Sequence, residues 1–446
     1  MRTFNYDANY NPQSTTDSLG IVAGFLFSAN GTLQAGVVGY DLTAQPAKAS
    51  QFIYDAFGSL TSSTDALGRT TSYTYNLFGN KLSMTLPPPN GSTTGSATTY
   101  QYDTVGNLVQ TNAPLGSVTK SQYDANGNRT QTTDPDGNVT IYKYDVLNRL
   151  IEVDYPSNSI TPATKTTKTY DFRNNVITST DQAGNVTLNT YDLAGRLVSV
   201  TRGSGSATPS TTSYTYYADG RKWTETDPLG QTTTYVYDKA GRLITVKNTA
   251  GSTSYAYDDA GNQISSTDPN NNTTQYQYDA RKRLITTTYP DKTTVTNAYD
   301  AAGNVISVTD QAGNVIQSNY DAANQLTSVV QEGSPNSAPN NTTTYAYDGD
   351  GNQINVTDEN GHTTQNAYDA LNRLKSVTLP DGSLKESRLY DPAGNLTSLT
   401  DFNGKITTFA YDALNRLVTR TPDTDHWAPS RHCRTPGESC MCAWSL

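Results

Sequence analysis

The sequence predicts an all-β chain of tandem β-hairpin repeats that form one long, coiled antiparallel sheet, either a spiral or part of a hollow shell. Three observations support this fold class. An aromatic residue followed by Asp or a substitute recurs about every 21 residues. Two turn motifs rich in Gly, Asx and Pro interrupt each repeat, and the segments between the turns show strand-like alternation.

The recurring aromatic residue, which we call the anchor, occurs nineteen times between Tyr6 and Tyr411. Tyr102, Tyr123 and Tyr144 show the usual spacing of 21 residues. A few intervals extend to 25–27 residues and contain loop-like insertions such as residues 87–91 and 333–336. The repeat array is therefore predicted to fill residues 1–420.

Each repeat contains two turns. In the repeat that starts at Tyr123, Asp124 and Gly127 mark the first turn, and the second turn is Asp-Pro-Asp-Gly at residues 134–137. The five to seven residues between turns are rich in Thr, Val, Ile, Tyr and Leu, which is the composition of strands. Sustained helical spacing of apolar residues is absent from the sequence.

The fourth residue after each anchor predicts a left-handed backbone. It is Gly in twelve repeats, and Asn in five others: Asn148, Asn174, Asn324, Asn372 and Asn415. Only Tyr10 and Lys282 depart from this pattern. Gly and Asn accept a positive φ more readily than other residues, so this position is predicted to close a tight turn.

Period-two alternation predicts one tyrosine-rich sheet face. Thr140, Tyr142 and Tyr144 share a face, because side chains alternate along a strand. Tyrosines of neighbouring repeats lie two strands, roughly 10 Å, apart and do not stack directly. We expect them to pack against aliphatic residues of the intervening strand, such as Leu150, Leu243 and Leu284.

The composition predicts a thin wall. Only 34% of the 446 residues are hydrophobic, which excludes a thick aliphatic core, and the 10% aromatic content argues against disorder. Two strands per repeat give on the order of 37 strands, which would span roughly 180 Å if flat. Sheets of that width curl, and this one is too wide for its own side chains to fill the interior.

Two segments show a family resemblance. Residues 191–197, Tyr-Asp-Leu-Ala-Gly-Arg-Leu, and residues 227–238 resemble YD repeats. These repeats build the Rhs and wall-associated proteins, the bacterial toxin-complex shells and the teneurins. The resemblance implies a β-sheet cocoon that, in many members, encloses a C-terminal toxin. It also implies a secreted or cell-surface location, and a toxin or effector polypeptide as the partner.

The sequence departs from the full family pattern near its C-terminal end. Residues 391–396 come close to the autoproteolytic element Asp-Pro-x-Gly-Leu, but Asn395 intervenes. No toxin domain follows, so the chain is expected to be a section of a longer shell. Residues 421–446 lack the repeat and are expected to be disordered or out of frame. Their Cys and His residues match no standard zinc spacing: His426, His432, Cys433, Cys440 and Cys442.

The overall charge and hydropathy exclude two further classes of partner. The net charge of −10 disfavours binding to nucleic acid, which depends on clustered cations. No apolar run approaches the roughly 20 residues of a membrane helix. The best run, residues 21–27, is predicted to be a strand, and no signal peptide is visible.

No catalytic, cofactor or metal site is predicted. Asp124 and Asp134 occupy turn positions, where Asp bonds nearby backbone amides. Residues 134–137 lack the ligand series of a calcium loop, and His362 is expected to be a solvated turn residue. The leading hypothesis is a non-enzymatic structural segment of an exported Rhs-type toxin shell. The alternative is a cell-surface adhesin that binds carbohydrate through Tyr and Asn; an enzyme such as a nuclease is a weak third reading.

Overall fold

The computed structural model describes residues 3–6, 12–16, 22–27, 33–40, 49–88, 95–157, 163–332, 341–382 and 384–423. These residues form 38 strands and one short 3-10 helix, η1 (Pro114–Gly116). The first nineteen strands are β1 (Thr3–Tyr6), β2 (Pro12–Thr16), β3 (Val22–Phe27), β4 (Leu33–Tyr40), β5 (Ala49–Tyr54), β6 (Leu60–Thr64), β7 (Thr70–Tyr75), β8 (Lys81–Thr85), β9 (Ala97–Tyr102), β10 (Leu108–Asn112), β11 (Val118–Tyr123), β12 (Arg129–Thr133), β13 (Val139–Tyr144), β14 (Leu150–Asp154), β15 (Lys165–Tyr170), β16 (Val176–Thr180), β17 (Val186–Tyr191), β18 (Leu197–Arg202) and β19 (Ser210–Tyr216).

The remaining strands continue the same pattern. They are β20 (Lys222–Thr226), β21 (Thr232–Tyr237), β22 (Leu243–Asn248), β23 (Gly251–Tyr257), β24 (Gln263–Thr267), β25 (Thr273–Tyr278), β26 (Leu284–Thr288), β27 (Thr294–Tyr299), β28 (Val305–Thr309), β29 (Val315–Tyr320), β30 (Leu326–Glu332), β31 (Asn341–Tyr347), β32 (Gln353–Thr357), β33 (Thr363–Tyr368), β34 (Leu374–Thr378), β35 (Lys385–Tyr390), β36 (Leu396–Thr400), β37 (Ile406–Tyr411) and β38 (Leu417–Pro422).

Each strand pairs antiparallel with the next strand in the sequence, so the sheet is a continuous meander. Turns that follow an anchor join an odd-numbered strand to the next even-numbered one; we call them anchor turns. Turns that lead from an even-numbered strand to the next odd-numbered one are the return turns. A meander places all anchor turns along one edge of the sheet, the anchor rim, and all return turns along the other, the return rim.

The register of each well-described anchor hairpin shifts beside the anchor, and the extra residue of this β-bulge lies on the even-numbered strand. In the hairpin of β13 and β14, the register shifts between Lys143 and Tyr144, and Tyr144 then pairs with Leu150. Because Lys143 pairs with Glu152, Ile151 is the extra residue of this bulge, which lies beyond the turn itself. Bulges increase local twist and bend the strand, and their regular repetition favours a curled sheet.

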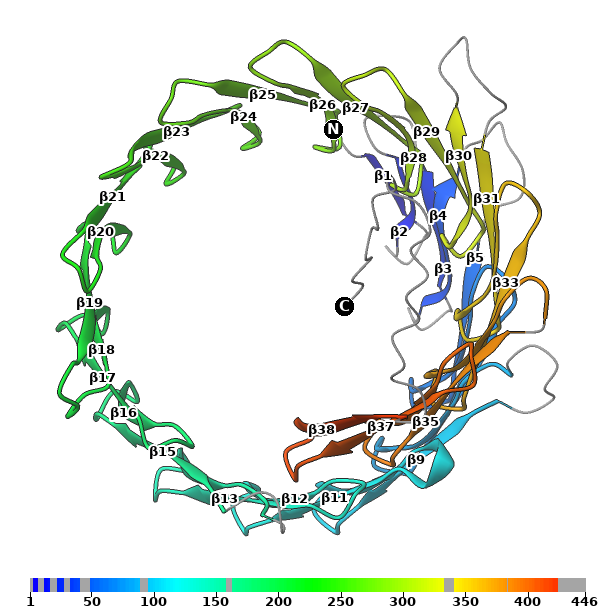
Figure 1. Cartoon of the computed structure of the whole chain (residues 1–446), viewed down its shortest axis with the longest axis horizontal. Helices are drawn as coiled ribbons and strands as arrows, with labels where there is room; N and C mark the ends of the chain where they lie inside the picture. Colours follow the sequence, from blue (N-terminus) through cyan, green and yellow to red (C-terminus); the bar gives the residue numbers. More distant parts are fainter. Residues whose placement is uncertain are drawn as a thin grey trace, which may run out of the picture.

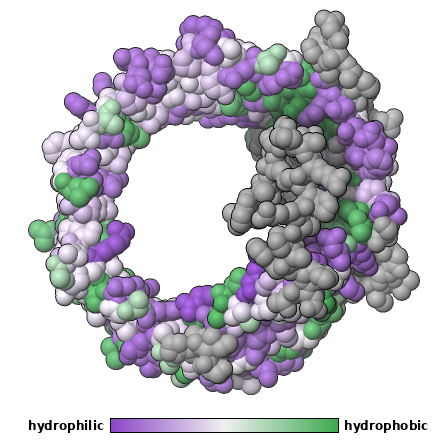
Figure 2. Space-filling model, viewed as in Figure 1, coloured by the Kyte–Doolittle hydropathy of each residue, from purple (hydrophilic) through white to green (hydrophobic). Residues whose placement is uncertain are grey.

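The sheet curls into a ring with an open centre (Figure 1), and strands near the C-terminal end lie beside strands near the N-terminal end. The space-filling view shows the same hollow ring, with apolar residues as separate patches around it (Figure 2). Within the described residues the only buried hydrophobic side chain is Ala413, and no large side chain is fully buried. A single-layer sheet has no second layer to cover it, so the prediction of a thin wall is confirmed.

The structure confirms the predicted fold class of a long, coiled antiparallel sheet. The apolar segment at residues 21–27 forms β3, as expected. β38 extends two residues past the predicted end of the array at residue 420, and the boundary itself stays a prediction. Within the described part of the chain, no helix has the length and apolar character that a membrane span requires.

Candidate functional site in the repeat wall

The anchor turn is the basic unit of the wall, and the turn after Tyr144 shows its geometry. The Asp145 carboxylate Oδ1 accepts the backbone N–H groups of Leu147 at 2.9 Å and Arg149 at 3.0 Å. The N–H of Asn148 donates to the Asp145 carbonyl oxygen at 3.0 Å. Asn148 has a φ of 60°, which is the left-handed region. One Asp side chain therefore satisfies two amides that the turn leaves free.

The predicted left-handed position is confirmed in every anchor turn whose fourth residue is described. The glycines have positive φ, for example 82° at Gly127, and so do all five asparagines. Lys282, which departs from the sequence pattern, also has a φ of 64°. The other exception, Tyr10, lies outside the described residues. The fourth residue after the anchor therefore adopts a positive φ even where, as at Lys282, the residue type does not favour that conformation.

Return turns use the same bonding pattern. Asp134 Oδ1 accepts the N–H groups of Asp136 at 3.0 Å and Asn138 at 2.8 Å. Its other oxygen accepts Asn138 Nδ2 at 2.9 Å. The turn roles predicted for Asp124 and Asp134 are therefore confirmed. Among the described residues no group of three or more His, Cys, Asp or Glu side chains could hold a metal ion.

The fifth residue after the anchor, usually Asn or Arg, bonds the second oxygen of the turn carboxylate. The Arg149 side chain, bonded to Asp145, lowers the pKa of that carboxyl below its ordinary value. The Asn128 side chain is the largest cause of a similarly lowered pKa at Asp124. His362 occupies the equivalent place in a return turn. Its ring is exposed, as predicted, and its Nδ1 lies 3.2 Å from Asp358 Oδ2.

Where the fifth residue is Arg, its side chain also connects neighbouring repeats. Arg149 Nη1 donates to the Asp171 carbonyl oxygen at 2.9 Å, and its guanidinium carbon lies 4.8 Å from the centre of the Tyr170 ring. We call this arrangement the arginine staple. The same ring contact, at 4.5–5.0 Å, occurs in five further pairs: Arg196–Tyr216, Arg221–Tyr237, Arg242–Tyr257, Arg283–Tyr299 and Arg373–Tyr390.

The anchor hydroxyl forms a second bond between repeats. Tyr170 donates to the carbonyl oxygen of Leu150 at 2.7 Å, whereas packing of the ring against the Leu150 side chain stays a prediction. The hydroxyls of Tyr257 and Tyr299 reach the Leu243 and Leu284 carbonyls in the same way, both at 2.8 Å. With the hydroxyl bonded and an Arg over the ring, a stapled tyrosine presents little free surface for stacking on a sugar.

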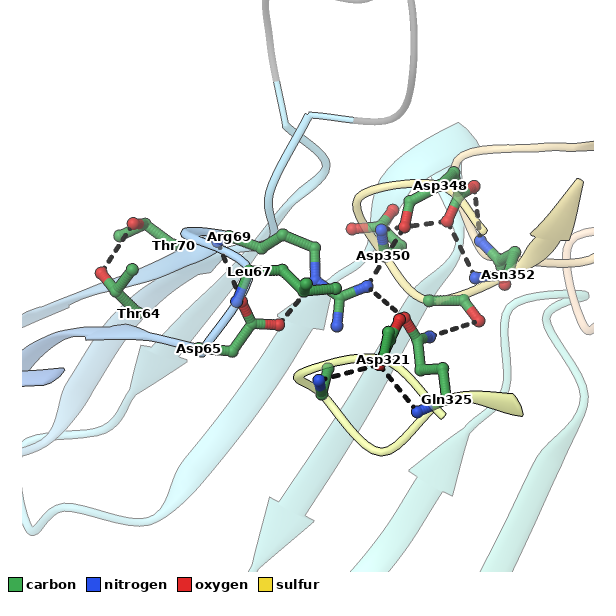
Figure 3. Close-up of polar contacts among 12 residues, drawn as sticks. Thr64, Asp65, Leu67, Arg69, Thr70, Asp321, Gln325, Asp348, Asp350 and Asn352 are labelled. Carbon is green, nitrogen blue, oxygen red and sulfur yellow. Dashed lines mark hydrogen bonds and ion pairs between the residues drawn. The ribbon is translucent and has the colours of Figure 1, made fainter. Parts of the chain in front are cut away.

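A seam joins the start of the ring to its second turn (Figure 3). Arg69, in the return turn between β6 and β7, donates through Nη1 to Gln325 Oε1 at 3.0 Å and to the Asp348 carbonyl oxygen at 3.3 Å. These partners lie 256 and 279 residues away in the sequence, in two successive anchor turns. One turn of the spiral therefore contains roughly twelve repeats.

Two more contacts follow the same seam. A Cβ added at Gly349 would lie 2.5 Å from the carbonyl oxygen of Pro88, so the two backbones touch. The Ala393 N–H bonds the Asp136 carboxylate, and burial, together with the facing charge of Asp391, raises the pKa of Asp136. At each contact the return rim of the first spiral turn meets the anchor rim of the second.

The sequence reasoning identified the turns but missed the staples and the seam. The sequence signal for the staples is the alternation of Asn and Arg at the fifth position after the anchor. The insertion at residues 87–91 is described only up to Pro88, and residues 333–336 lie outside the described residues. So do His426, His432, Cys433, Cys440 and Cys442, on which the question of a zinc site depended.

Comparisons with known proteins agree with this geometry. A family model described as RHS Repeat matches eight segments: residues 54–93, 123–160, 164–207, 216–253, 257–294, 299–334, 347–384 and 390–426. No curated protein matches the sequence.

Among solved structures, TcdB2-TccC3 is similar over 94% of this chain, with a TM-score of 0.70 and 19% identity. A Photorhabdus luminescens Tc holotoxin pore is similar over 95% of the chain, with a TM-score of 0.67 and 19% identity. This chain spans 26% and 27% of those chains, about a quarter of their length. At this identity the likeness shows the shared fold. Because the repeat model covers more than half of the sequence, the chain belongs to the RHS repeat family.

Proposed function

We propose that this chain is a section of the wall of an exported Rhs-type toxin shell and that it encloses or presents an effector polypeptide. One observation carries the proposal. A single-layer sheet curls around an open centre, and its second turn closes on its first through Arg69. A hollow wall whose second turn bonds to its first surrounds a lumen on its sides, which is what a section of a container wall requires.

The bonding within the wall supports the same role. Adjacent repeats are joined by arginine staples and tyrosine hydroxyl bonds in addition to the strand ladder. A wall held by many repeated polar contacts can remain thin without a hydrophobic core. The similarity to Tc toxin structures supports a place in a secreted or cell-surface toxin assembly.

We expect the chain itself to have no catalytic activity. The turn carboxylates, the most abundant candidate acids and bases, bond backbone amides in every repeat quoted above. Such a carboxylate has little capacity left for proton transfer to a substrate. Nuclease or glycosidase activity in the purified chain would contradict this expectation.

The test is trypsin digestion of the full gene product, which contains this chain and whatever the gene encodes beyond codon 446. If the array continues and leads to a further domain, that domain should resist trypsin in the intact protein. It should become cleavable when Arg69, which makes two hydrogen bonds across the seam, is replaced by Ala. Unrelated sequence beyond the array in every reading frame, or a following domain that is cleaved at the same rate with and without the seam, would contradict the proposed function.

A further inference from the structure

Part of the anchor rim is open and apolar. Six anchor turns between residues 55 and 196 each place a large hydrophobic side chain at the tip of the turn, between 81% and 98% exposed: Phe57, Phe78, Val105, Val146, Phe172 and Leu193. Soluble proteins rarely line up exposed apolar groups in this way without a partner. Turn tips are solvated by default and do not require large hydrophobic residues, although the Phe172 ring centre does lie 5.1 Å from the guanidinium carbon of Arg173.

The rest of the anchor rim shows what covers such tips. In the second spiral turn, Ala413 at an anchor-turn tip is only 3% exposed, and Asp348 and Asp412 beside the tips are buried. At the seam contacts described above, return turns of the same chain cover this part of the rim. The open part belongs to the same rim and is separated from the covered part by five anchor turns, which follow Tyr216, Tyr237, Tyr257, Tyr278 and Tyr299.

Spacing limits the choice of partner. Anchor turns recur every two strands, so their tips follow one another at intervals of roughly 10 Å. A partner that meets every tip in the same way must repeat at that interval. A return rim repeats at the same interval, because its turns also recur every two strands. It is also the surface that already pairs with the anchor rim within this chain.

We propose that a second copy of this chain docks the open part of its return rim, the return turns between residues 227 and 314, onto the apolar anchor rim of the first copy. The contact is heterologous, so copies stack in one direction and can form more than a dimer. It concerns the rims alone and does not depend on what the lumen holds.

The large side chains at the anchor-turn tips fit the open return turns better than the return turns that the second spiral turn already covers. Gly349 has to be small because it faces Pro88, which lies in an insertion between β8 and β9. The return turns at 268–272 and 310–314 have no such insertion, and the connection between β22 and β23 is shorter still. Compact turns leave space for Phe and Val. The return-turn residue Leu229 is 83% exposed and adds an apolar contact from the partner.

The test is sedimentation velocity of the full 446-residue chain under reducing conditions, from about 1 to 100 μM. We expect concentration-dependent association that strengthens with salt, because salt screens the repulsion between copies of charge −10 while apolar contacts persist. The tip variant combines Phe78→Ser, Phe172→Ser and Leu193→Ser and should weaken association about tenfold or more.

The matched control is Ile141→Ser, which replaces an apolar side chain that is 40% exposed in the middle of strand β13, away from both rims. It should associate like the unchanged chain. Unchanged thermal unfolding of the tip variant would establish that it folds. A chain that stays monomeric across the range, or a tip variant that associates as well as the control, would overturn the proposal.

Discussion

Arg149 and Tyr170 belong to adjacent repeats, and the guanidinium carbon of one lies 4.8 Å from the ring centre of the other. The same Arg bonds Asp145 in its own turn and the Asp171 carbonyl in the next. The side chain thus connects a turn, a ring and a neighbouring backbone. Because this arrangement recurs along the array, polar staples take over part of the role that a hydrophobic core has in globular domains.

The staple predicts that Arg149→Lys destabilises the wall locally. Lysine keeps the charge but loses the planar fork that bonds Asp145 and Asp171 together while covering Tyr170. We expect a loss of about 1–2 kcal/mol, seen as faster amide exchange in β14 and β15. Replacement of the exposed turn residue Lys239 by Ala is the control and should leave exchange unchanged. Equal exchange in both variants would show that the staple contributes nothing.

Gly127 tests the left-handed turn position. It has a φ of 82°, and an added Cβ would meet nothing within 4 Å, so any cost of substitution comes from the backbone alone. Gly127→Ala should cost about 1–2 kcal/mol, whereas Gly127→Asn should cost clearly less, because Asn tolerates this conformation. Urea denaturation of the two variants measures the difference. An Ala variant as stable as the Asn variant would contradict the account.

Acid should weaken the turns. The pKa values of Asp145 and Asp124 are lowered by bonds to Arg149 and Asn128 in the folded state. A lowered folded pKa contributes stability that is present above the ordinary value, about 4, and is lost as the pH falls through the folded value. The urea concentration at which half of the protein is unfolded should therefore decrease as the pH is lowered from about 5 to about 3. A midpoint that stays constant over this range would contradict the role of the carboxylates.

Asp136 should behave in the opposite way. Burial, and then the facing Asp391, raise its pKa, so its contribution to the seam is full at acid pH and is lost as the pH rises through the raised value. Asp136→Asn keeps an acceptor for the Ala393 N–H but removes the charge. At pH 7 it should slow amide exchange at residues 391–395, and the benefit should vanish near pH 3. Faster exchange in the variant at pH 7 would show that the charge stabilises the seam.

The sequence was sufficient to predict the hairpins, the turn positions and the curling of the sheet, because these depend on residues close together in one repeat. Lys282 shows the limit of that reasoning, since only its place in the repeat indicated a left-handed backbone. The staples depend on the offset between neighbouring repeats, which period-two alternation does not define. The contact of Arg69 with Gln325 depends on twist summed over roughly twelve repeats, and a small error per strand would place the two far apart.

The most direct test of the central claim is the distance between spin labels at positions 67 and 344, measured by double electron–electron resonance in a chain whose three Cys are replaced by Ser. Leu67 lies in the return turn that carries Arg69, and Thr344 lies on β31, which leads into the anchor turn of Asp348. A second turn that closes on the first predicts a narrow distribution below roughly 30 Å, since Thr344 is four extended residues from Asp348. A flat array would separate β7 and β31 by roughly 115 Å. The absence of any short distance would contradict the closed spiral.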